Sequence, residues 1–220
     1  MGACHNRRMS ETPWRVPHRI ETERLVLRRY ESSDAEEMSR VIIASRHYLA
    51  PWLPWARDEP ISLADRSERI AAFMREYDEG TDFLMGIFLR DSGAYLGGTG
   101  LHTRLGQGIL EIGYWIAADQ QRNGYVTEAA IALTQVAIDF AGAERVEIHH
   151  LPKNLHSRAI PERCSFTYEG RHEMLMPGVD ELEAADVWVA TEDNLETGLL
   201  ASTPRPRLYN EAGWGLEWPA

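Results

Sequence analysis

The sequence contains little cysteine and no long apolar run. Cys4 and Cys164 are the only cysteines among its 220 residues, which argues against a disulfide framework and indicates a reducing compartment, the cytoplasm. No apolar run approaches the roughly 20 residues that a helix needs to cross a bilayer. The first residues also contain no hydrophobic signal core. We therefore expect a cytoplasmic protein that does not bind membranes.

A basic face and a metal-binding pattern are missing as well. Lysine and arginine number 23 against 34 aspartates and glutamates, for a net charge of −11, so nucleic-acid binding is not expected. The surplus of carboxylates could attract a cationic amine, although solubility alone explains it. The eight histidines include no H-E-x-x-H or other ligand spacing, so we predict no metal site.

The most informative stretch covers residues 111–140. Its first six residues alternate in the period-2 pattern of a strand. After Thr127, apolar residues follow at steps of three and four, which predicts an amphipathic helix. The intervening loop, residues 121–126, presents backbone N–H groups at the helix N-terminus, where they lack intrahelical partners and can bind a phosphate. Gly124 lets the anion approach the backbone without a Cβ in the way.

Other elements follow from the same rules. Ser33 and Glu36 form a capping-box pattern that predicts the start of one helix, and Ser62 is the expected N-cap of a second. The long helix after residue 127 implies that the strands on either side of it pair in parallel. Strands are predicted at residues 22–30, 83–89, 95–102, 110–116, 145–150, 167–176 and 184–189.

The 121–129 segment follows a known pattern. Gln121, Gly124 and residues 125–129 match the sequence Gln or Arg, two residues, Gly, one residue, and then Gly or Ala. This pattern resembles the acetyl-CoA motif of the GNAT N-acetyltransferase superfamily. Arg122 stands where relatives often carry another Gly, and Val126 stands where the motif requires Gly or Ala. The two departures make the loop stiffer and bulkier.

Three other segments resemble the RimJ/RimL-like branch of the superfamily. Residues 22–28, TERLVLR, resemble its opening strand. The run Trp52-Leu53-Pro54-Trp55 resembles a loop that, in this branch, walls the acceptor pocket. Residues 154–166 resemble its Asn-x-x-Ser segment and the short helix that follows, with Cys164 and Ser165 in place of Leu and Gly.

Pro161 lies inside the last of these segments. A proline in a helix interior costs about 3 kcal/mol, so we expect the helix to begin at Ser157 or Arg158 and to keep Pro161 in its first turn. Asn154 then precedes the helix. It could hold the pantetheine arm and serve as the N-cap, and the two roles are compatible.

The resemblance covers about residues 20–191. It implies an α/β (α+β) GNAT fold, with a central mixed, largely antiparallel twisted sheet of about seven strands flanked by helices. In this fold a splayed parallel pair of strands holds acetyl-CoA. We divide the chain into an N-terminal tail (1–19), the acetyltransferase domain (20–191) and a C-terminal extension (192–220). The extension could pack back on the domain, cover a neighbouring subunit or fray, and the protein could be a monomer or a homodimer.

The resemblance also implies a set of binding residues. In the splayed strand, backbone N–H groups could bind the thioester oxygen as charge develops on it. The expected coenzyme-binding residues are Trp115, Ile116, Ala117, Gln121, Arg122, Asn123, Gly124, Tyr125, Val126, Thr127 and Asn154. The residues expected to contact the acceptor are Trp52, Trp55 and Tyr114.

Catalysis needs a neutral amine and a proton for the leaving thiolate. Glu111 is the first candidate for the base, acting through water. Ser157, which the resemblance brings near the leaving sulfur, could donate the proton, and Tyr168 could do so only if its hydroxyl points into the gap. Cys164 is expected to pack in the core and not to act as a nucleophile. Weaker candidates for the base are His149, Glu147 and Glu173.

These features predict an acetyl-CoA-dependent N-acetyltransferase that transfers the acetyl group directly to a primary amine. Two tryptophans held by prolines form a rigid apolar wall, which suits the first side chains of a peptide. We therefore favour a protein or peptide N-terminal α-amine as the acceptor. The alternatives are a small-molecule amine (a polyamine, an aminoglycoside or another antibiotic) and a non-catalytic acyl-CoA-binding sensor of the same fold.

Overall fold

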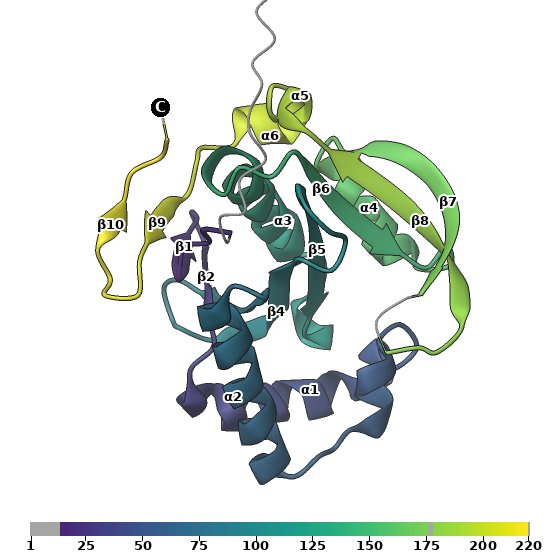
Figure 1. Cartoon of the computed structure of the whole chain (residues 1–220). Coiled ribbons are helices and arrows are strands. Elements are labelled where there is room, and N and C mark those ends of the chain that lie inside the picture. The colour runs from purple at the N-terminus through teal and green to yellow at the C-terminus, as the bar shows by residue number, and fades with distance from the viewer. Residues whose placement is uncertain (1–13, 176–177, 220) are drawn as a thin grey trace, which may run out of the picture.

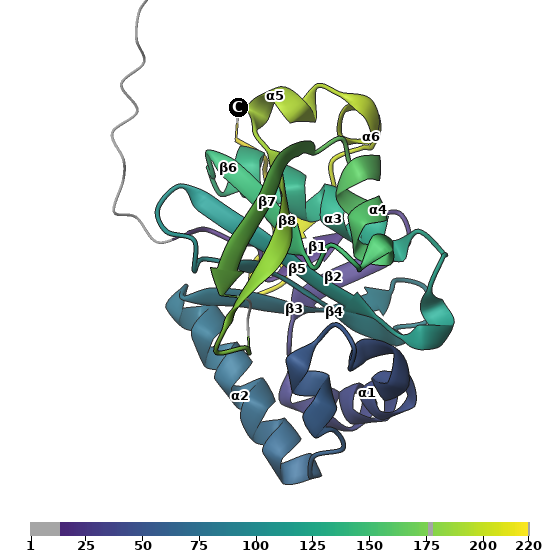
Figure 2. The same cartoon turned by 90° about the vertical axis from the view of Figure 1, so that its right-hand side faces the viewer.

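A mixed sheet of ten strands, in the order β10-β9-β1-β2-β3-β4-β5-β6-β8-β7, runs through the computed structural model, which describes residues 14–175 and 178–219 (Figures 1 and 2). The seven predicted strands correspond to β2 to β8, and β1, β9 and β10 are additional. The strands are β1 (Arg19–Glu21), β2 (Leu25–Arg29), β3 (Asp82–Leu89), β4 (Tyr95–His102), β5 (Ile109–Ile116), β6 (Arg145–His150), β7 (Thr167–Leu175), β8 (Leu182–Ala190), β9 (Arg207–Tyr209) and β10 (Gly215–Leu216).

Helices cover both faces of this sheet (Figure 2). Side chains alternate along β2, so Leu25 and Leu27 pack with α3 on one face, whereas Val26 packs with α1 and α2 on the other. None of the helices in the described part of the chain is both long and apolar enough to cross a membrane. The helices are α1 (Ala35–Leu49), α2 (Leu63–Glu79), α3 (Tyr125–Gln135, continued by a π-helical turn, Val136–Phe140), α4 (Leu155–Arg163), α5 (Glu192–Leu195) and α6 (Gly198–Ser202), with short 3-10 turns at Ser32–Asp34, Pro54–Asp58 and Ala118–Gln120.

The two predicted helix starts have different outcomes. Ser62 caps α2 as predicted, because its hydroxyl accepts the N–H of Asp65 at 3.1 Å. The predicted capping box of Ser33 and Glu36 was wrong, since the helical segment already begins at Ser32. Asp34 makes the cap instead: its Oδ2 accepts the Glu31 N–H at 2.8 Å. The guanidinium of Arg28 on β2 holds both oxygens of the same carboxylate.

The strands β5 and β6 form the parallel pair that the sequence predicted. Only three residue pairs are in register, and the last joins Glu111 to Glu147. Beyond that pair, β5 continues to Ile116 and β6 to His150 without pairing to each other. The sheet therefore opens at its centre, and the exposed backbone groups of the two strands face the opening.

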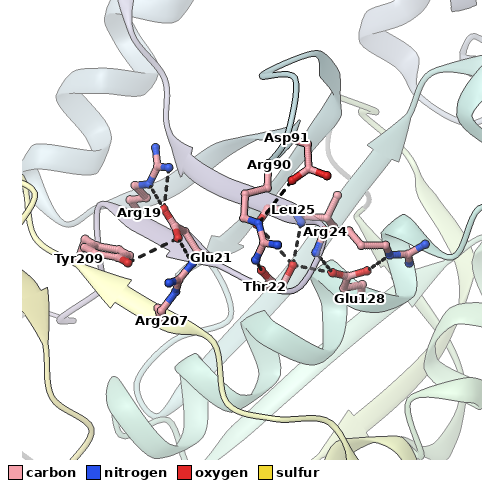
Figure 3. A network of polar contacts seen from close by, with 10 residues as sticks. All are labelled: Arg19, Glu21, Thr22, Arg24, Leu25, Arg90, Asp91, Glu128, Arg207 and Tyr209. Atoms are coloured by element: carbon pink, nitrogen blue, oxygen red, sulfur yellow. Dashed lines mark hydrogen bonds and ion pairs between the residues drawn. The ribbon is translucent and has the colours of Figure 1, made fainter.

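The C-terminal extension packs back on the sheet, one of the three outcomes that the sequence left open. β9 pairs antiparallel with β1, and β10 pairs with β9. The indole of Trp218 lies edge-on to Phe140 with 6.0 Å between ring centroids, and its N–H donates to the carbonyl of Pro206 at 3.1 Å. Arg207 and Tyr209 both bind Glu21 of β1 (Figure 3). The extension thus adds two strands, β9 and β10, to the edge of the sheet.

Candidate active site

Two cavities meet at the opening between β5 and β6. The first, which we call the α3 cavity, has a volume of about 430 Å³ and reaches the loop before α3. The second, the α2 cavity, has a volume of about 550 Å³ and is lined by α2, β5 and β6. A ligand in one cavity can therefore contact a ligand in the other. The residues that line both cavities are Trp52, Leu53, Tyr114, Trp115, Asn154 and Ser157.

The loop before α3 forms an anion cradle at one end of the α3 cavity. Gly124 caps the helix in a left-handed conformation with φ 79°, and Arg122 adopts the same region with φ 64° although it is not a glycine. The first N–H used inside the helix is that of Glu128, which donates to the Gly124 carbonyl at 3.0 Å. The N–H groups of residues 125–127 are therefore left for a ligand. The Thr127 hydroxyl is buried and has no hydrogen-bond partner among the residues that the structure describes, and these features together fit a pyrophosphate.

Glu128 fastens this cradle to the turn between β1 and β2 (Figure 3). One carboxylate oxygen accepts the Thr22 hydroxyl at 2.6 Å and the Arg24 N–H at 2.9 Å, and the other accepts the Arg24 Nε at 2.6 Å. Arg24 also donates to the carbonyl of Asn123 at 3.0 Å and lies over the ring of Tyr125, 4.8 Å from its centroid. Two segments that are far apart in sequence thus fix the conformation of the loop.

Two of the predicted coenzyme-binding residues do not line the α3 cavity. The N–H of Ala117 donates to the Leu96 carbonyl of β4 at 2.8 Å. The prediction that this N–H binds the thioester oxygen was therefore wrong. Hydrogen-bonding direction alternates along an antiparallel strand, so the N–H of Ile116 points away from β4, towards the opening. Asn123 turns its amide to the carbonyl of Gln120. The predicted residues that do line the cavity are Trp115, Ile116, Gln121, Arg122, Gly124, Tyr125, Val126, Thr127 and Asn154.

Helix α4 begins earlier than the sequence predicted. It starts at Leu155, and the Asn154 side chain caps it by accepting the Ser157 N–H at 3.1 Å. The expected start at Ser157 or Arg158 was wrong, and Pro161 lies inside the helix and not in its first turn. The cap uses the amide oxygen of Asn154 and leaves its nitrogen for a ligand. It also holds Ser157 at the junction of the two cavities.

Tyr114 and Ser157 are in contact at this junction. The Tyr114 hydroxyl lies 3.0 Å from the Ser157 hydroxyl and 3.1 Å from the Ser157 carbonyl oxygen. Burial raises the pKa of Tyr114 well above its ordinary value, more than the Ser157 hydrogen bond lowers it. The tyrosine therefore stays protonated and acts as a hydrogen-bond donor.

Glu111 lines the α2 cavity, but both of its carboxylate oxygens are paired. They accept the Nε and Nη2 of Arg104 at 2.8 and 2.6 Å, and the side chain is buried. His149 Nδ1 lies 3.9 Å from Glu111, and its Nε2 lies 2.5 Å from Glu147. Burial alone would raise the pKa of Glu147, but His149 and Arg145 outweigh burial and lower it. A single charged network therefore joins these two carboxylates across the parallel strands.

Arg104 and His102 are site residues that sequence reasoning missed. His102 lines the α2 cavity and pairs with Asp82 at 2.8 Å. The register of two strands could have identified them, because β4 and β5 form a hairpin in which His102 lies opposite Glu111. A residue just beyond position 102 must then lie close to Glu111, and Arg104 does so.

The two tryptophans of the 52–55 segment differ in their surroundings. Trp52 lines both cavities. Trp55 lines only the α2 cavity and packs edge-on against Trp115, with 5.8 Å between ring centroids. It belongs to the apolar cluster of α1 and α2, and Trp52 does not.

Two of the weaker candidates lie away from the junction. Glu173 is exposed on β7 and lines neither cavity. The hydroxyl of Tyr168 donates to Asp186 at 3.0 Å, and the side chain is 48% exposed, so it does not point into the opening. Cys164 is fully buried, as expected for a packing residue, and burial raises the pKa of its thiol to about 12.

Comparisons with known proteins identify the family. Residues 24–167 match the model of the acetyltransferase (GNAT) domain. YdaF of Bacillus subtilis (strain 168), assigned as a ribosomal N-acetyltransferase, is 32% identical over 151 residues, which cover 68% of this chain and 81% of that protein. The [ribosomal protein uS5]-alanine N-acetyltransferase of Escherichia coli (strain K12) is 24% identical, covering 69% and 79%.

A comparison with solved structures also finds the GNAT acetyltransferase fold. The structure of RimL, a ribosomal L7/L12 alpha-N-protein acetyltransferase in complex with coenzyme A, superposes with a TM-score of 0.68. The match covers 80% of this chain and 99% of that one at 18% identity. The anion cradle, the opened parallel strands and the family match agree. The chain belongs to the GNAT acetyltransferase family, and it is an N-acetyltransferase that uses acetyl-CoA as its acetyl donor.

Proposed function

We propose that this enzyme acetylates the N-terminal α-amine of a peptide or protein. The observation that carries the proposal is the α2 cavity, which meets the α3 cavity at Tyr114 and Ser157 and has Trp52 and Trp55 in its walls. An aromatic wall of this kind buries the first side chains of a peptide at small entropic cost. The names of YdaF and of the uS5-alanine enzyme, which refer to the ribosome or to a ribosomal protein, support the same choice.

The chemistry of the amine also favours this acceptor. An α-amine with a pKa of about 8 is roughly 9% neutral at pH 7, whereas a lysine amine with a pKa of about 10.4 is neutral to only about 0.04%. The α-amine therefore needs little help to become a nucleophile. The carboxylates that line the α2 cavity are Glu111 and Glu183, and Arg104 already occupies both oxygens of Glu111. A site whose buried carboxylate is already paired with an arginine suits an α-amine, which needs little help from a base, better than a lysine.

Each residue at the junction then has a role. Acetyl-CoA supplies an activated acetyl thioester when it is bound in the α3 cavity. The cradle at residues 124–127 holds the pyrophosphate, and Asn154 offers its amide nitrogen to the pantetheine arm. The N–H of Ile116 donates to the thioester oxygen, where negative charge develops. Ser157 donates a hydrogen bond to the leaving sulfur, and Glu111 accepts the amine proton through water.

An acceptor screen tests the proposal. Thiol release from acetyl-CoA is followed with peptides that have a free N-terminus, with the same peptides blocked at the N-terminus but containing lysine, and with a polyamine and an aminoglycoside. We expect turnover with the free peptides and little with the blocked ones. Turnover confined to the polyamine or the aminoglycoside would contradict the proposal.

Glu111→Gln tests the assigned base. Because an α-amine is already about 9% neutral at pH 7, the base can raise the supply of neutral amine by about tenfold, so we expect kcat at pH 7 to fall by about tenfold. The deficit should shrink above about pH 8, where solvent supplies the neutral amine. Glu173→Gln, an exposed carboxylate outside both cavities, is the matched control and should leave the rate unchanged. A Glu111→Gln deficit that is constant with pH would assign this residue a structural role.

A further inference from the structure

Pro161 leaves one backbone acceptor of α4 without its normal partner. In an α-helix the carbonyl of residue i accepts the N–H of residue i+4, and Pro161 has no N–H to give to Ser157. The neighbouring bonds of the helix are present: Arg158 donates to the Asn154 carbonyl at 3.0 Å, and Cys164 donates to the Ile160 carbonyl at 3.0 Å. The missing bond therefore falls on the residue that lies at the junction of the two cavities.

The Tyr114 hydroxyl replaces the missing donor from another element. It donates to the Ser157 carbonyl at 3.1 Å, from β5 to α4. The carbonyl has no proton of its own, so in this contact the tyrosine must be the donor. The Ser157 hydroxyl, 3.0 Å from the same oxygen, is then free to turn its own proton towards the cavities.

We infer that Pro161 is a positioning residue for the acetyl transfer. By removing the intrahelical donor, it makes the Ser157 carbonyl dependent on Tyr114, and the resulting bond ties α4 to the unpaired end of β5. The distance between these two elements sets how closely the thioester and the amine approach. The inference rests on the role proposed for Ser157 at the leaving sulfur, and it adds the residue that holds Ser157 in place.

Two other polar contacts of α4 do not replace this bond. The Asn154 cap acts within α4 and its preceding loop. The Cys164 thiol reaches the Thr127 carbonyl of α3 at 3.8 Å, at the far end of α4. Neither contact joins α4 to β5. Loss of the Tyr114 hydroxyl should therefore loosen the junction and leave a part-buried carbonyl without a donor, which is the costly case for a hydrogen bond.

A double-mutant cycle of Tyr114→Phe and Pro161→Ala tests the inference. In the natural background we expect Tyr114→Phe to lower kcat by about tenfold, with little change in KM for acetyl-CoA, because the carbonyl is left unpaired. In the Pro161→Ala background the new backbone N–H at position 161 is available to the carbonyl, so the same change should cost less than about threefold. Equal losses in the two backgrounds, or no loss in either, would overturn the inference.

Equilibrium unfolding in urea on the same four proteins separates this inference from the proposed acceptor. It reports the coupling between residues 114 and 161 without any acceptor, while the kinetic arm uses whichever amine gives the fastest thiol release. Coupling in both measurements supports the inference, and its absence from the unfolding data refutes it whatever the acceptor is. Tyr168→Phe is the matched control, because its hydroxyl binds Asp186. Its effect should be the same in both Pro161 backgrounds.

Discussion

Trp52→Ala and Trp55→Ala should affect different properties of the enzyme, although both indoles are half-buried in one short segment. Trp55 packs on Trp115 and on the cluster between α1 and α2, whereas Trp52 lines both cavities. We expect truncation of Trp55 to cause mainly a loss of stability. We expect truncation of Trp52 to cause mainly a loss of acceptor binding.

The structure sets the size of the stability effect. Truncating a fully buried tryptophan costs about 3–5 kcal/mol, and about half of that applies to the half-buried Trp55. Its edge-on contact with Trp115 adds about 0.5–1.5 kcal/mol. The free energy of unfolding should thus fall by about 2–4 kcal/mol for Trp55→Ala. For a chain of this size that corresponds to a Tm about 4–16 °C lower.

Trp52→Ala should lower Tm less than Trp55→Ala does, because the indole of Trp52, although also half-buried, belongs to neither apolar cluster. A buried aromatic residue at the centre of a binding site is commonly worth about 2 kcal/mol or more, so kcat/KM for a peptide acceptor should fall by roughly 30-fold. Acetyl-CoA binding should change much less, because the cradle at residues 124–127 is intact. Trp214→Ala, at a side chain that is 72% exposed beside β10, is the matched control and should change neither quantity.

The assays are thermal unfolding, calorimetric titration with acetyl-CoA and steady-state kinetics with a peptide acceptor. If Trp52→Ala lowers Tm as much as Trp55→Ala does, without a specific effect on the acceptor, Trp52 is a core residue. The peptide hypothesis would then lose its main support.

Three further predictions follow from backbone conformation and from perturbed pKa values. Gly124→Ala should raise the Kd for acetyl-CoA and destabilise the fold by about 1–2 kcal/mol, because its φ of 79° is strained for any residue with a Cβ. Isothermal titration measures the first effect and urea unfolding the second. No change in either quantity would mean that the pyrophosphate binds at another place. Burial raises the pKa of Cys164 to about 12, so in a Cys4→Ser variant iodoacetamide at pH 8 should label the thiol only in urea; fast labelling of the native protein would contradict its buried position. The lowered pKa of Glu147 means that its stabilisation is complete above the unfolded value of 4.5 and is lost as the pH falls through the lower native value. Glu147→Gln should therefore lower the urea midpoint at pH 7 more than at pH 3, and equal shifts at both pH values would argue against the pairing with His149.

Local chemistry made much of this fold predictable. β4 and β6 have the predicted bounds, β4 because a turn-forming sequence at residues 91–93 precedes it and β6 because its polar and apolar residues alternate. The Ser62 cap formed because it needs only a hydroxyl and a backbone N–H three residues later. The left-handed turn at Gly124 was predictable for the same reason, since a strand, a short loop and a helix are adjacent in sequence.

The errors occurred where a distant residue decides the outcome. Asp34, and not Ser33, makes the first cap because Arg28 of β2 fixes its carboxylate. Helix α4 contains Pro161, and the carbonyl that the proline leaves without an intrahelical donor accepts the Tyr114 hydroxyl from β5. The sequence pattern around the proline does not indicate that a tyrosine from β5 will supply this hydrogen bond.

The ion pair in the site could not be predicted from the sequence either, because it also depends on a residue of another element. The predicted base, Glu111, was identified by its place on the strand, but its pairing with Arg104 depends on the register of the β4–β5 hairpin. The packing of the extension was beyond prediction because β9 is only three residues long and pairs with a strand near the other end of the sequence.

The pairing of β9 with β1 affects the order in which the protein can fold during synthesis. Arg207 and Glu21, which join these strands, are 186 residues apart in the chain. At about 5–20 residues per second, the ribosome needs roughly 10–40 s to make that length. Until β9 is made, β1 can pair only with β2. The turn that follows β1 binds Glu128 as soon as α3 has been made. The loop before α3 is therefore anchored through Thr22 and Arg24 before β9 exists, so the proposed coenzyme site can form before the sheet is complete.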